Sequence, residues 1–286
     1  MKEYDLIKKA YAKINLGLKT VSKRDDGYHE LEMVMVNVDL YDTLYFKITK
    51  DLEVVMDNSI CKMEDNIVYK AALLMKNKYD VKDGVTIEIE KHIPDGGGMG
   101  GGSSDAGCTI LALNQLWGLN LSKEELIDIA SQIGSDVCFF LYNELSLVKG
   151  RGEIVEPIGK SINEGIILVI PNIKCSTKDI YQNHVVKNNL NKISNIVNNI
   201  EGDYYKYLFN DLEVTTKKIY KNYLLDQIKI DLIKCGCIAS LMSGSGSTIF
   251  GIKDKNKEFD GRSFSKKYSD CKIIYCKTIL LNCQTN

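Results

Sequence analysis

The stretch Pro94-Asp-Gly-Gly-Gly-Met-Gly-Gly-Gly-Ser-Ser-Asp-Ala-Gly107 carries six glycines among the seven residues from Gly96 to Gly102. Each glycine loses more backbone entropy on folding than any other residue, so an ordinary core does not favour such a run. A glycine run does offer backbone N–H groups that no side chain obstructs. Placed at the start of a helix, those groups form a site for phosphate.

Regular elements are predicted on both sides of this run. Alternating apolar residues predict a strand over 85–89 that leads into it. Helical spacing predicts a helix from Ala106 to Trp117 behind it, with Ser103 or Ser104 as its cap and Asp105 near the positive end of its dipole. A strand, a glycine loop and a helix therefore follow one another directly.

Three kinds of nucleotide-binding loop compete as explanations of the run. A Walker P-loop ending at Gly159-Lys160-Ser161 would need a glycine five residues before Gly159, where the chain has Ile154. Gly96, Gly98 and Gly101 match a dinucleotide-binding pattern, but in so glycine-dense a run that match is nearly automatic. In the third alternative the whole run wraps a triphosphate while one trailing serine approaches Mg²⁺. A flexible linker is disfavoured because regular elements flank the run.

Elsewhere strands and helices mix without a regular βαβ alternation, which favours an α+β fold over a doubly wound sheet. The second and third predicted strands are joined at Tyr41-Asp42. A boundary between Pro157 and Gly165 divides the chain into an N-terminal domain, 1–160, and a C-terminal domain, 161–286. The predicted strands cover residues 12–18, 33–40, 43–48, 165–171, 237–241, 248–252 and 272–280. The predicted helices cover residues 67–79, 122–134, which a capping box opens, and much of 188–235.

The composition is that of an ordinary globular protein. The chain has 286 residues, 44% hydrophobic and 26% charged, and a formal net charge of −1. This near neutrality gives no indication of a nucleic-acid partner or an anionic membrane. Nine cysteines occur without a Cys-x-x-Cys pair. No signal segment or apolar run of about 18 residues is evident. We therefore expect a cytoplasmic protein, in an oligomeric state that the sequence leaves open.

Several residues have both a structural and a functional interpretation. Lys13 and Asn15 lie on the open face of the strand over 12–18, where polar side chains are usually solvated. Asp136 follows the helix stop Gly134, and spacing alone favours a helix cap. The segment Ser243 to Ser247 is either a plain hairpin loop or a second backbone nest for an anion.

Together and in this order, these pieces resemble the kinase superfamily that includes galactokinase, homoserine kinase, mevalonate kinase and phosphomevalonate kinase. The signature loop of that superfamily is matched from Pro94 to Ala106. Within it, the members that phosphorylate a cytidyl substrate are the most similar. The matching segments are Ala-Lys-Ile-Asn-Leu at 12–16, Asp-Gly-Tyr-His at 26–29, Glu-Asp-Asn at 64–66, Gly-Ser-Asp-Val at 134–137, Asn-Asp-Leu-Glu at 210–213 and Ser-Gly-Ser-Gly-Ser at 243–247.

The resemblance implies a two-domain small-molecule kinase with a ferredoxin-like C-terminal domain. It implies ATP and Mg²⁺ as cofactors and a hydroxyl of a small cytidyl substrate as the acceptor. The implied catalytic residues are Asp136, as the base, and Lys13 beside it. The implied ATP-binding residues are Pro94, Gly96, Gly97, Gly98, Met99, Gly100, Gly101, Gly102, Ser103, Ser104 and Asn66. The implied substrate contacts are Asn15 and Thr177, with Tyr28 and His29 against the cytosine and Tyr181 against its other face.

Three positions depart from the usual pattern of these kinases. Met99 stands where leucine is usual, Gly107 where alanine is frequent, and Cys138 where a proline follows the aspartate segment. A sibling kinase acting on homoserine or mevalonate is one alternative, but a substrate without a base needs no aromatic clamp such as Tyr28 and Tyr181. A Rossmann-type oxidoreductase is the alternative from another class.

Overall fold

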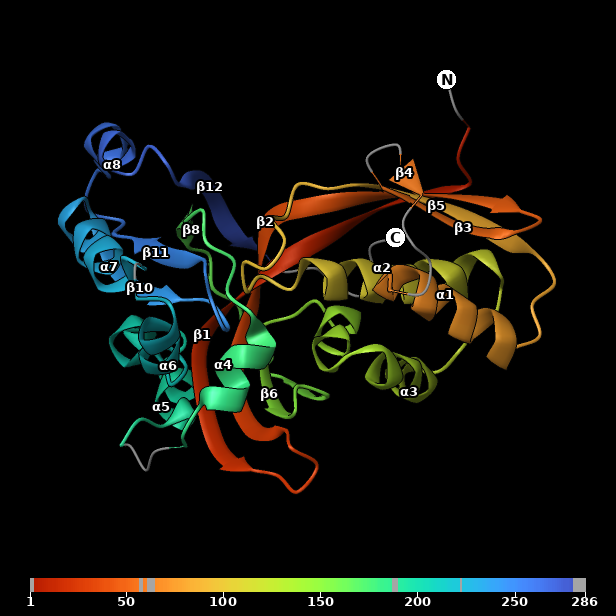
Figure 1. The fold of residues 1–286 in the computed structure, drawn as a ribbon, viewed down its shortest axis with the longest axis horizontal. Coiled ribbons are helices and arrows are strands. Elements are labelled where there is room, and N and C mark those ends of the chain that lie inside the picture. Colours follow the sequence, from red (N-terminus) through yellow and green to blue (C-terminus); the bar gives the residue numbers. More distant parts are fainter. Residues whose placement is uncertain (1–2, 57–58, 61–64, 187–189, 222, 280–286) are drawn as a thin grey trace. The chain divides into compact units, whose positions relative to one another are not determined.

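The computed structural model describes residues 3–56, 59–60, 65–186, 190–221 and 223–279 (Figure 1). The chain forms two compact units. Unit 1 comprises Met1–Ala12, Leu40–Asp95 and Gly100–Tyr142, and unit 2 comprises Lys13–Asp39, Gly96–Met99 and Asn143–Asn286. Two long strands, β1 (Leu6–Lys23) and β2 (His29–Thr49), contribute residues to both units. Strands and helices mix within each unit, so the expected α+β class is confirmed.

Unit 1 combines a small mixed sheet with a group of helices. Strand β5 (Gly84–Glu90) is antiparallel to β2 and parallel to β3 (Leu52–Met56), which pairs with β4 (Ser59–Ile60). Helices α1 and α2 lie on one face of this sheet, with α3 packed against both (Figure 1). The helical segments are α1 (Ile67–Lys78), α2 (Gly101–Leu116), α3 (Lys123–Ile133), η1 (Ser135–Val137) and η2 (Phe139–Leu141).

Two of these helices begin as the sequence predicts. Asn66 caps α1, since its side-chain oxygen accepts the backbone N–H of Val68 at 2.8 Å. The preceding Glu64 lies outside the described residues. Ser122 and Glu125 form the predicted capping box of α3, which ends at Gly134.

Helix α2 begins five residues earlier than predicted. Its N-cap is Gly100, which has a left-handed φ of 71°, and the carbonyl of Gly100 accepts the N–H of Ser104 at 2.8 Å. Ser103 and Ser104 therefore lie in the first turn, and the prediction that one of them caps the helix is wrong. The left-handed conformation decides the start of α2, because glycine adopts it without steric cost.

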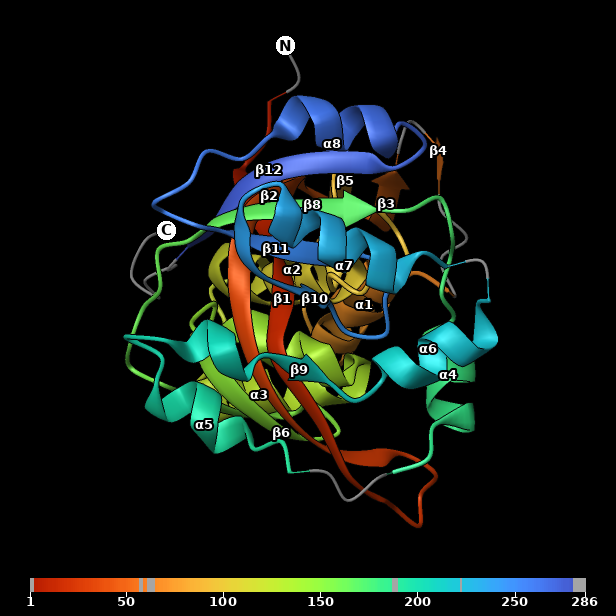
Figure 2. The same cartoon turned by 90° about the vertical axis from the view of Figure 1, so that its left-hand side faces the viewer.

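Unit 2 contains an antiparallel sheet in the order β10, β11, β8, β12. Along the chain these strands occur as β8, helices, β10, β11, helix, β12. That order and connection define a ferredoxin-like arrangement, so this expectation is also confirmed. Helices α7 and α8 cover one face of the sheet (Figure 2). The strands are β8 (Gly165–Ile170), β10 (Cys237–Met242), β11 (Ile249–Lys253) and β12 (Lys272–Ile279).

Shorter elements complete unit 2. Strand β2 also pairs with β6 (Ser146–Gly150), which pairs with β7 (Ile154–Pro157). Strand β1 pairs in parallel with β9 (Phe209–Asn210). The helices are α4 (Thr177–Asn183), α5 (Ile193–Asn198), η3 (Tyr204–Tyr207), α6 (Glu213–Ile219), α7 (Leu225–Lys234) and α8 (Gly261–Lys267). Within the described part of 188–235, helices thus predominate, as predicted.

Two predictions about the long strands are wrong. Lys13 and Asn15 are buried, at 3% and 0% exposure, whereas a solvated face was expected. The predicted strands over 33–40 and 43–48 are one strand, β2, which continues through Tyr41 and Asp42. The strand continues through Asp42 because the side chain of Asp42 accepts hydrogen bonds from the backbone of His92 and Ile93. The polar residue therefore holds a distant segment of unit 1 and does not mark a strand end.

Among the residues that the structure describes, no helix is both long enough and apolar enough to cross a bilayer.

Candidate active site

The glycine loop, residues 94–102, presents a row of backbone N–H groups. Gly96, Gly98 and Gly100 have left-handed φ values of 70°, 72° and 71°, and they alternate with other conformations. Such alternation turns successive N–H groups into one concavity. Asp95 and Gly96 form a turn, and within the described chain the N–H groups from Gly98 to Ser103 donate to no backbone carbonyl of a loop or turn. The loop and the first turn of α2 therefore have the donors that an anion requires.

The carbonyl side of the loop is held by unit 2. A Cβ on Gly98 would lie 2.2 Å from the carbonyl oxygen of Ser243, so only glycine permits this approach. The carbonyls of Gly97, Gly98 and Met99 accept hydrogen bonds from Thr248 N at 3.2 Å, Ser243 Oγ at 3.0 Å and Lys13 N at 3.0 Å, respectively. These bonds fix the loop while leaving its N–H groups available.

The two serines after the loop differ in their environments. Ser104 is buried, and its hydroxyl donates to the carbonyl of Tyr11 at 2.7 Å. Ser103 is half-buried in the first turn of α2. Ser103 is therefore the serine whose hydroxyl can meet a ligand.

A buried ionic cluster joins the segments before and after the loop within unit 1. Lys91 Nζ donates to Asp42 Oδ2 at 2.5 Å and to Asp105 Oδ2 at 2.8 Å. Asp42 Oδ1 also accepts the N–H groups of His92 and Ile93. Burial, opposed by Lys91 and aided by the charge of Asp42, raises the pKa of Asp105 to about 8. Sequence reasoning missed this cluster; its one signal was an aspartate inside an apolar strand pattern.

The Asp105 pKa has a measurable consequence for stability. Between the unfolded pKa of about 3.9 and the folded value, the folded protein holds a proton that the unfolded chain has released. The free energy of unfolding is therefore expected to fall as pH rises from 5 to 8, by up to about 1.4 kcal/mol per unit. Urea unfolding should show this slope in the wild type and a shallower slope in Asp105→Asn. Asp128→Asn, which changes an exposed carboxylate on α3, is the control. Parallel curves for wild type and Asp105→Asn would contradict the shifted pKa.

Lys13 lies against the Ser243–Ser247 segment, hereafter the second loop. Its Nζ donates to Asn15 Oδ1 at 2.6 Å and lies 3.4 Å from the position that a Cβ on Gly244 would occupy. Gly244 and Gly246 have left-handed φ values of 55° and 86°. Unit 2 thus brings together Lys13, Asn15, part of the glycine loop and the second loop.

Thr177 also contacts the second loop. Its hydroxyl lies 2.8 Å from Ser245 Oγ, and Tyr223 Oη donates to the carbonyl of Ser247 at 2.6 Å. Thr177 opens α4, the helix that carries Tyr181. Two of the residues expected to contact substrate, Thr177 and Tyr181, therefore lie on one short helix.

His29, Tyr181 and His184 form an aromatic cluster. The ring of His29 lies 5.5 Å from that of Tyr181 and 5.7 Å from that of His184. His29 is 4% exposed, and neither ring nitrogen has a hydrogen-bond partner among the described residues. Burial, with a contribution from Lys23, lowers the pKa of His29, so the ring is neutral at pH 7. Tyr28 is 54% exposed. The guanidinium carbon of Arg151 lies over the Tyr28 ring, 5.1 Å from the ring centre.

Asp136 lies in η1 of unit 1, directly after α3, and is half-buried. The cap of η1 is Gly134 without a side-chain bond, so the helix-cap interpretation of Asp136 is wrong. A Cβ on Gly107 of α2 would lie 2.8 Å from Phe140 Cβ, so the glycine permits close packing of α2 against η2. Cys138 has φ −58°, close to the value of about −65° that proline would impose. The expected proximity of Asp136 to Lys13 of unit 2 stays a prediction.

No group of three or more histidine, cysteine, aspartate or glutamate side chains within the described ranges could hold a metal ion. Asp105, the carboxylate nearest the loop serines in sequence, is paired with Lys91. Mg²⁺ in phosphoryl-transfer sites is bound largely by the nucleotide phosphates and water. The sparse protein donor set fits an ion that arrives with its nucleotide.

Two family models match the chain. The GHMP kinases N terminal domain matches residues 66–144, which include the glycine loop and Asp136. The GHMP kinases C terminal model matches residues 207–270, which include the second loop.

Curated relatives are similar over nearly the whole chain. A 4-diphosphocytidyl-2-C-methyl-D-erythritol kinase of Thermodesulfovibrio yellowstonii is 42% identical over 278 residues, covering 93% of this chain and 96% of the relative. The protein of that name from Thermoanaerobacter pseudethanolicus is 41% identical, covering 93% and 92%.

Solved structures agree with these relatives. A 4-(cytidine 5'-diphospho)-2C-methyl-D-erythritol kinase superposes with a TM-score of 0.78 at 26% identity, covering 96% of this chain and 99% of the other. A Methanococcus jannaschii mevalonate kinase gives a TM-score of 0.68 at 15% identity, covering 97% and 99%, and shares the fold.

Proposed function

Since this chain belongs to the GHMP kinase family, in its branch of 4-diphosphocytidyl-2-C-methyl-D-erythritol kinases, we propose that it phosphorylates 4-(cytidine 5'-diphospho)-2-C-methyl-D-erythritol. ATP donates its γ-phosphoryl group to the 2-hydroxyl of that substrate, a step of the non-mevalonate route to isoprenoid precursors. The observation that carries this assignment is 42% identity across 93% of the chain to a kinase of that name.

Phosphoryl transfer requires positioning and charge stabilisation more than covalent chemistry. The N–H groups of the glycine loop and of the first turn of α2 would bind the ATP phosphates. The ammonium of Lys13, held by Asn15 beside the second loop, would stabilise charge on the transferring group. Asp136 is the proposed base, which orients the hydroxyl and accepts its proton. Mg²⁺, bound with ATP and approached by the hydroxyl of Ser103, would neutralise phosphate charge.

The pyrimidine is assigned to the aromatic side chains of unit 2. The His29 ring is buried, neutral and without a hydrogen-bond partner among the described residues, as suits a group that meets a base edge. Tyr28 offers an exposed ring face, and Tyr181 lies against His29. Stacking of this kind contributes about 1–3 kcal/mol per base.

A coupled ADP-release assay tests the proposed function. We expect turnover with the cytidyl substrate and background rates with homoserine and mevalonate at equal concentrations. Equilibrium binding of ATP and NAD to the same preparation separates a kinase from a Rossmann-type oxidoreductase. Preference for homoserine or mevalonate, or binding of NAD in place of ATP, would overturn the proposal.

Tyr28→Ala is expected to raise KM for the cytidyl substrate by about fivefold to tenfold, with KM for ATP unchanged, since only the base loses a stacking surface. Steady-state kinetics with each substrate varied in turn measures the difference. Tyr207→Ala, which removes another exposed tyrosine at 39% exposure, is the matched control. Equal changes in both KM values would remove Tyr28 from the cytosine site.

The cytoplasm stays the proposed compartment. The seven cysteines that the structure describes are present as thiols, as is usual in a reducing compartment. Cys61 and Cys283 lie outside the described residues.

A further inference from the structure

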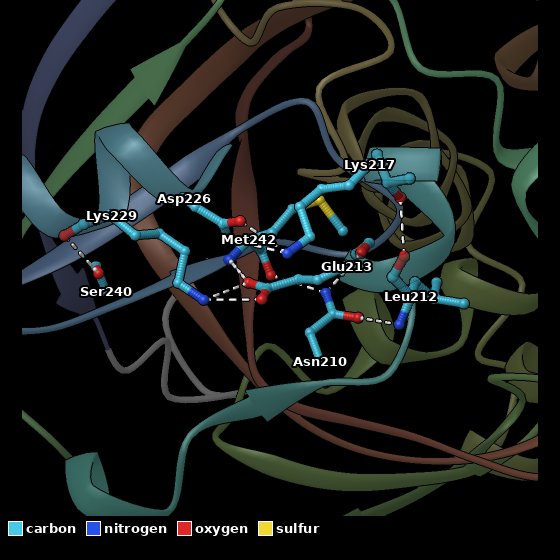
Figure 3. Close-up of polar contacts among 10 residues, drawn as sticks. Asn210, Leu212, Glu213, Lys217, Asp226, Lys229, Ser240 and Met242 are labelled. Carbon is cyan, nitrogen blue, oxygen red and sulfur yellow. Dashed lines mark hydrogen bonds and ion pairs between the residues drawn. The ribbon is translucent and has the colours of Figure 1, made fainter. Parts of the chain in front are cut away.

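The segment Asn210-Asp-Leu-Glu213, hereafter the brace, is four residues long, and its polar side chains bind different parts of unit 2. It lies where β9 ends and α6 begins, and β9 pairs with β1 at Leu18. Asn210 is 7% exposed and Leu212 is fully buried. Figure 3 shows Asn210 and Glu213 side by side, each directed toward Met242 at the end of β10.

Asn210 holds the entrance of the second loop. Its Nδ2 donates to the carbonyls of Met242 at 2.8 Å and Gly244 at 2.7 Å, and its Oδ1 accepts the N–H of Leu212 at 2.9 Å (Figure 3). Two carbonyls can only accept, so these partners determine which end of the amide faces the loop. Gly244 is the residue that lies against Lys13 Nζ.

Glu213 holds the same point from its other side. Its Oε1 accepts the N–H of Met242 at 3.0 Å, and its carboxylate is paired with Lys229 at 2.7 Å (Figure 3). Both backbone polar groups of Met242 are therefore bonded to the brace. The second loop begins at the next residue, so its first peptide is oriented by these bonds.

Asp211, between them, points to the aromatic cluster. Its Oδ2 accepts the N–H of Thr20 at 3.0 Å and the Thr20 hydroxyl at 3.4 Å. The same hydroxyl lies 2.8 Å from His184 Nε2, and His184 Nδ1 lies 2.9 Å from Thr215 Oγ1. The His184 ring thus bridges the hydroxyls of Thr20 and Thr215, and its tautomer decides which nitrogen donates. This chain fixes the ring of His184, which contacts His29.

We propose that the brace is a positioning element with two separate outputs. Asn210 and Glu213 set the second loop against Lys13 for phosphoryl transfer, and Asp211 sets His184 and His29, through Thr20, for recognition of the base. The assignment of these outputs rests on the proposed function. The brace holds both because its neighbouring side chains leave the backbone in different directions.

Two isosteric substitutions separate the outputs. Asn210→Asp removes both donors and places a carboxylate against two carbonyl oxygens, so we expect kcat to fall about 30-fold with KM for the cytidyl substrate within about twofold. Asp211→Asn weakens the bonds to Thr20, so we expect that KM to rise about fivefold to tenfold with kcat within about twofold. Lys217→Met is the control, because it removes only the exposed Lys217–Asp226 pair from α6 (Figure 3).

A pH series distinguishes positioning from simple destabilisation. A protonated aspartic acid at 210 regains one O–H donor, so the ratio of Asn210→Asp to wild-type kcat should rise as pH falls from 8 to 6. Each variant is assayed well below its Tm. If Asn210→Asp or Asp211→Asn does not fold, Glu213→Ala and Thr20→Val test the same two outputs and are expected to change kcat and KM, respectively.

The outcomes separate the brace from the enzyme assignment. A wild type that does not turn over the cytidyl substrate overturns the proposed function. An active wild type with unchanged variants, or with variants that change kcat and KM together in step with Tm, overturns the two outputs of the brace.

Discussion

Asp136→Asn is expected to lower kcat about 10²- to 10⁴-fold while KM for ATP and for the cytidyl substrate stays within about threefold. Asparagine has the size of aspartate but cannot accept the proton of the 2-hydroxyl. The substitution should be tolerated by the fold, because the Asp136 side chain is half-buried and asparagine occupies nearly the same volume. The expected loss is therefore confined to the chemical step.

Steady-state and single-turnover kinetics together measure this effect. Single turnover separates the chemical step from product release. Asp128→Asn on the neighbouring α3 is the matched control, since it changes a carboxylate that makes only surface contacts with Lys78 and Gln132. Turnover of Asp136→Asn near the wild-type rate would end the assignment of Asp136 as the base.

Gly98→Ala is expected to lower kcat/KM for ATP about 100-fold, the scale of loss that follows a displacement of about 1 Å in a substrate-positioning group. A Cβ at this position would lie 2.2 Å from the carbonyl oxygen of Ser243 and 2.9 Å from that of Gly246. Both contacts are with backbone, which cannot turn aside as a flexible side chain would. The glycine loop must therefore move away from the second loop, and the N–H groups proposed to bind phosphate move with it.

Gly96→Ala is the matched control for this substitution. Gly96 has nearly the same φ, 70° against 72°, but a Cβ there meets no atom within 4 Å. Gly96→Ala should therefore cost only the left-handed strain, about 1–2 kcal/mol of stability, with kcat/KM for ATP within about threefold. Equal losses in the two variants would mean that backbone strain, and not the approach of the two loops, explains the effect.

Local physics explains which predictions from the sequence were confirmed. The start of α1, the capping box of α3, strand β5 and the position of the glycine run before a helix depend on residues within a few positions of one another. The predicted start of α2 was wrong for a related local reason. Ser103 and Ser104 are good caps by residue type, but the left-handed conformation of Gly100 already begins the helix.

Burial explains what the sequence pattern missed. Lys13, Asn15 and Asp42 have the polarity of surface or turn residues, yet all three are buried. Two of them have a hydrogen-bond partner distant in sequence but in the same unit, Met33 for Asn15 and Lys91 for Asp42, whereas Lys13 is bonded to Asn15 on its own strand and lies against Gly244. A buried polar group requires such a partner, and no periodicity along the chain identifies it.

By itself the sequence determined the α+β class, most of the regular elements, the position of the glycine loop before a helix and, through its motifs, the kinase family. Tertiary structure alone decided which motifs meet: the second loop against Lys13 and Gly98, and the brace against Met242 and Thr20. The physical reason is that helix caps and glycine turns satisfy backbone groups locally, whereas the partners of buried side chains come from residues that only the folded chain brings within hydrogen-bond distance.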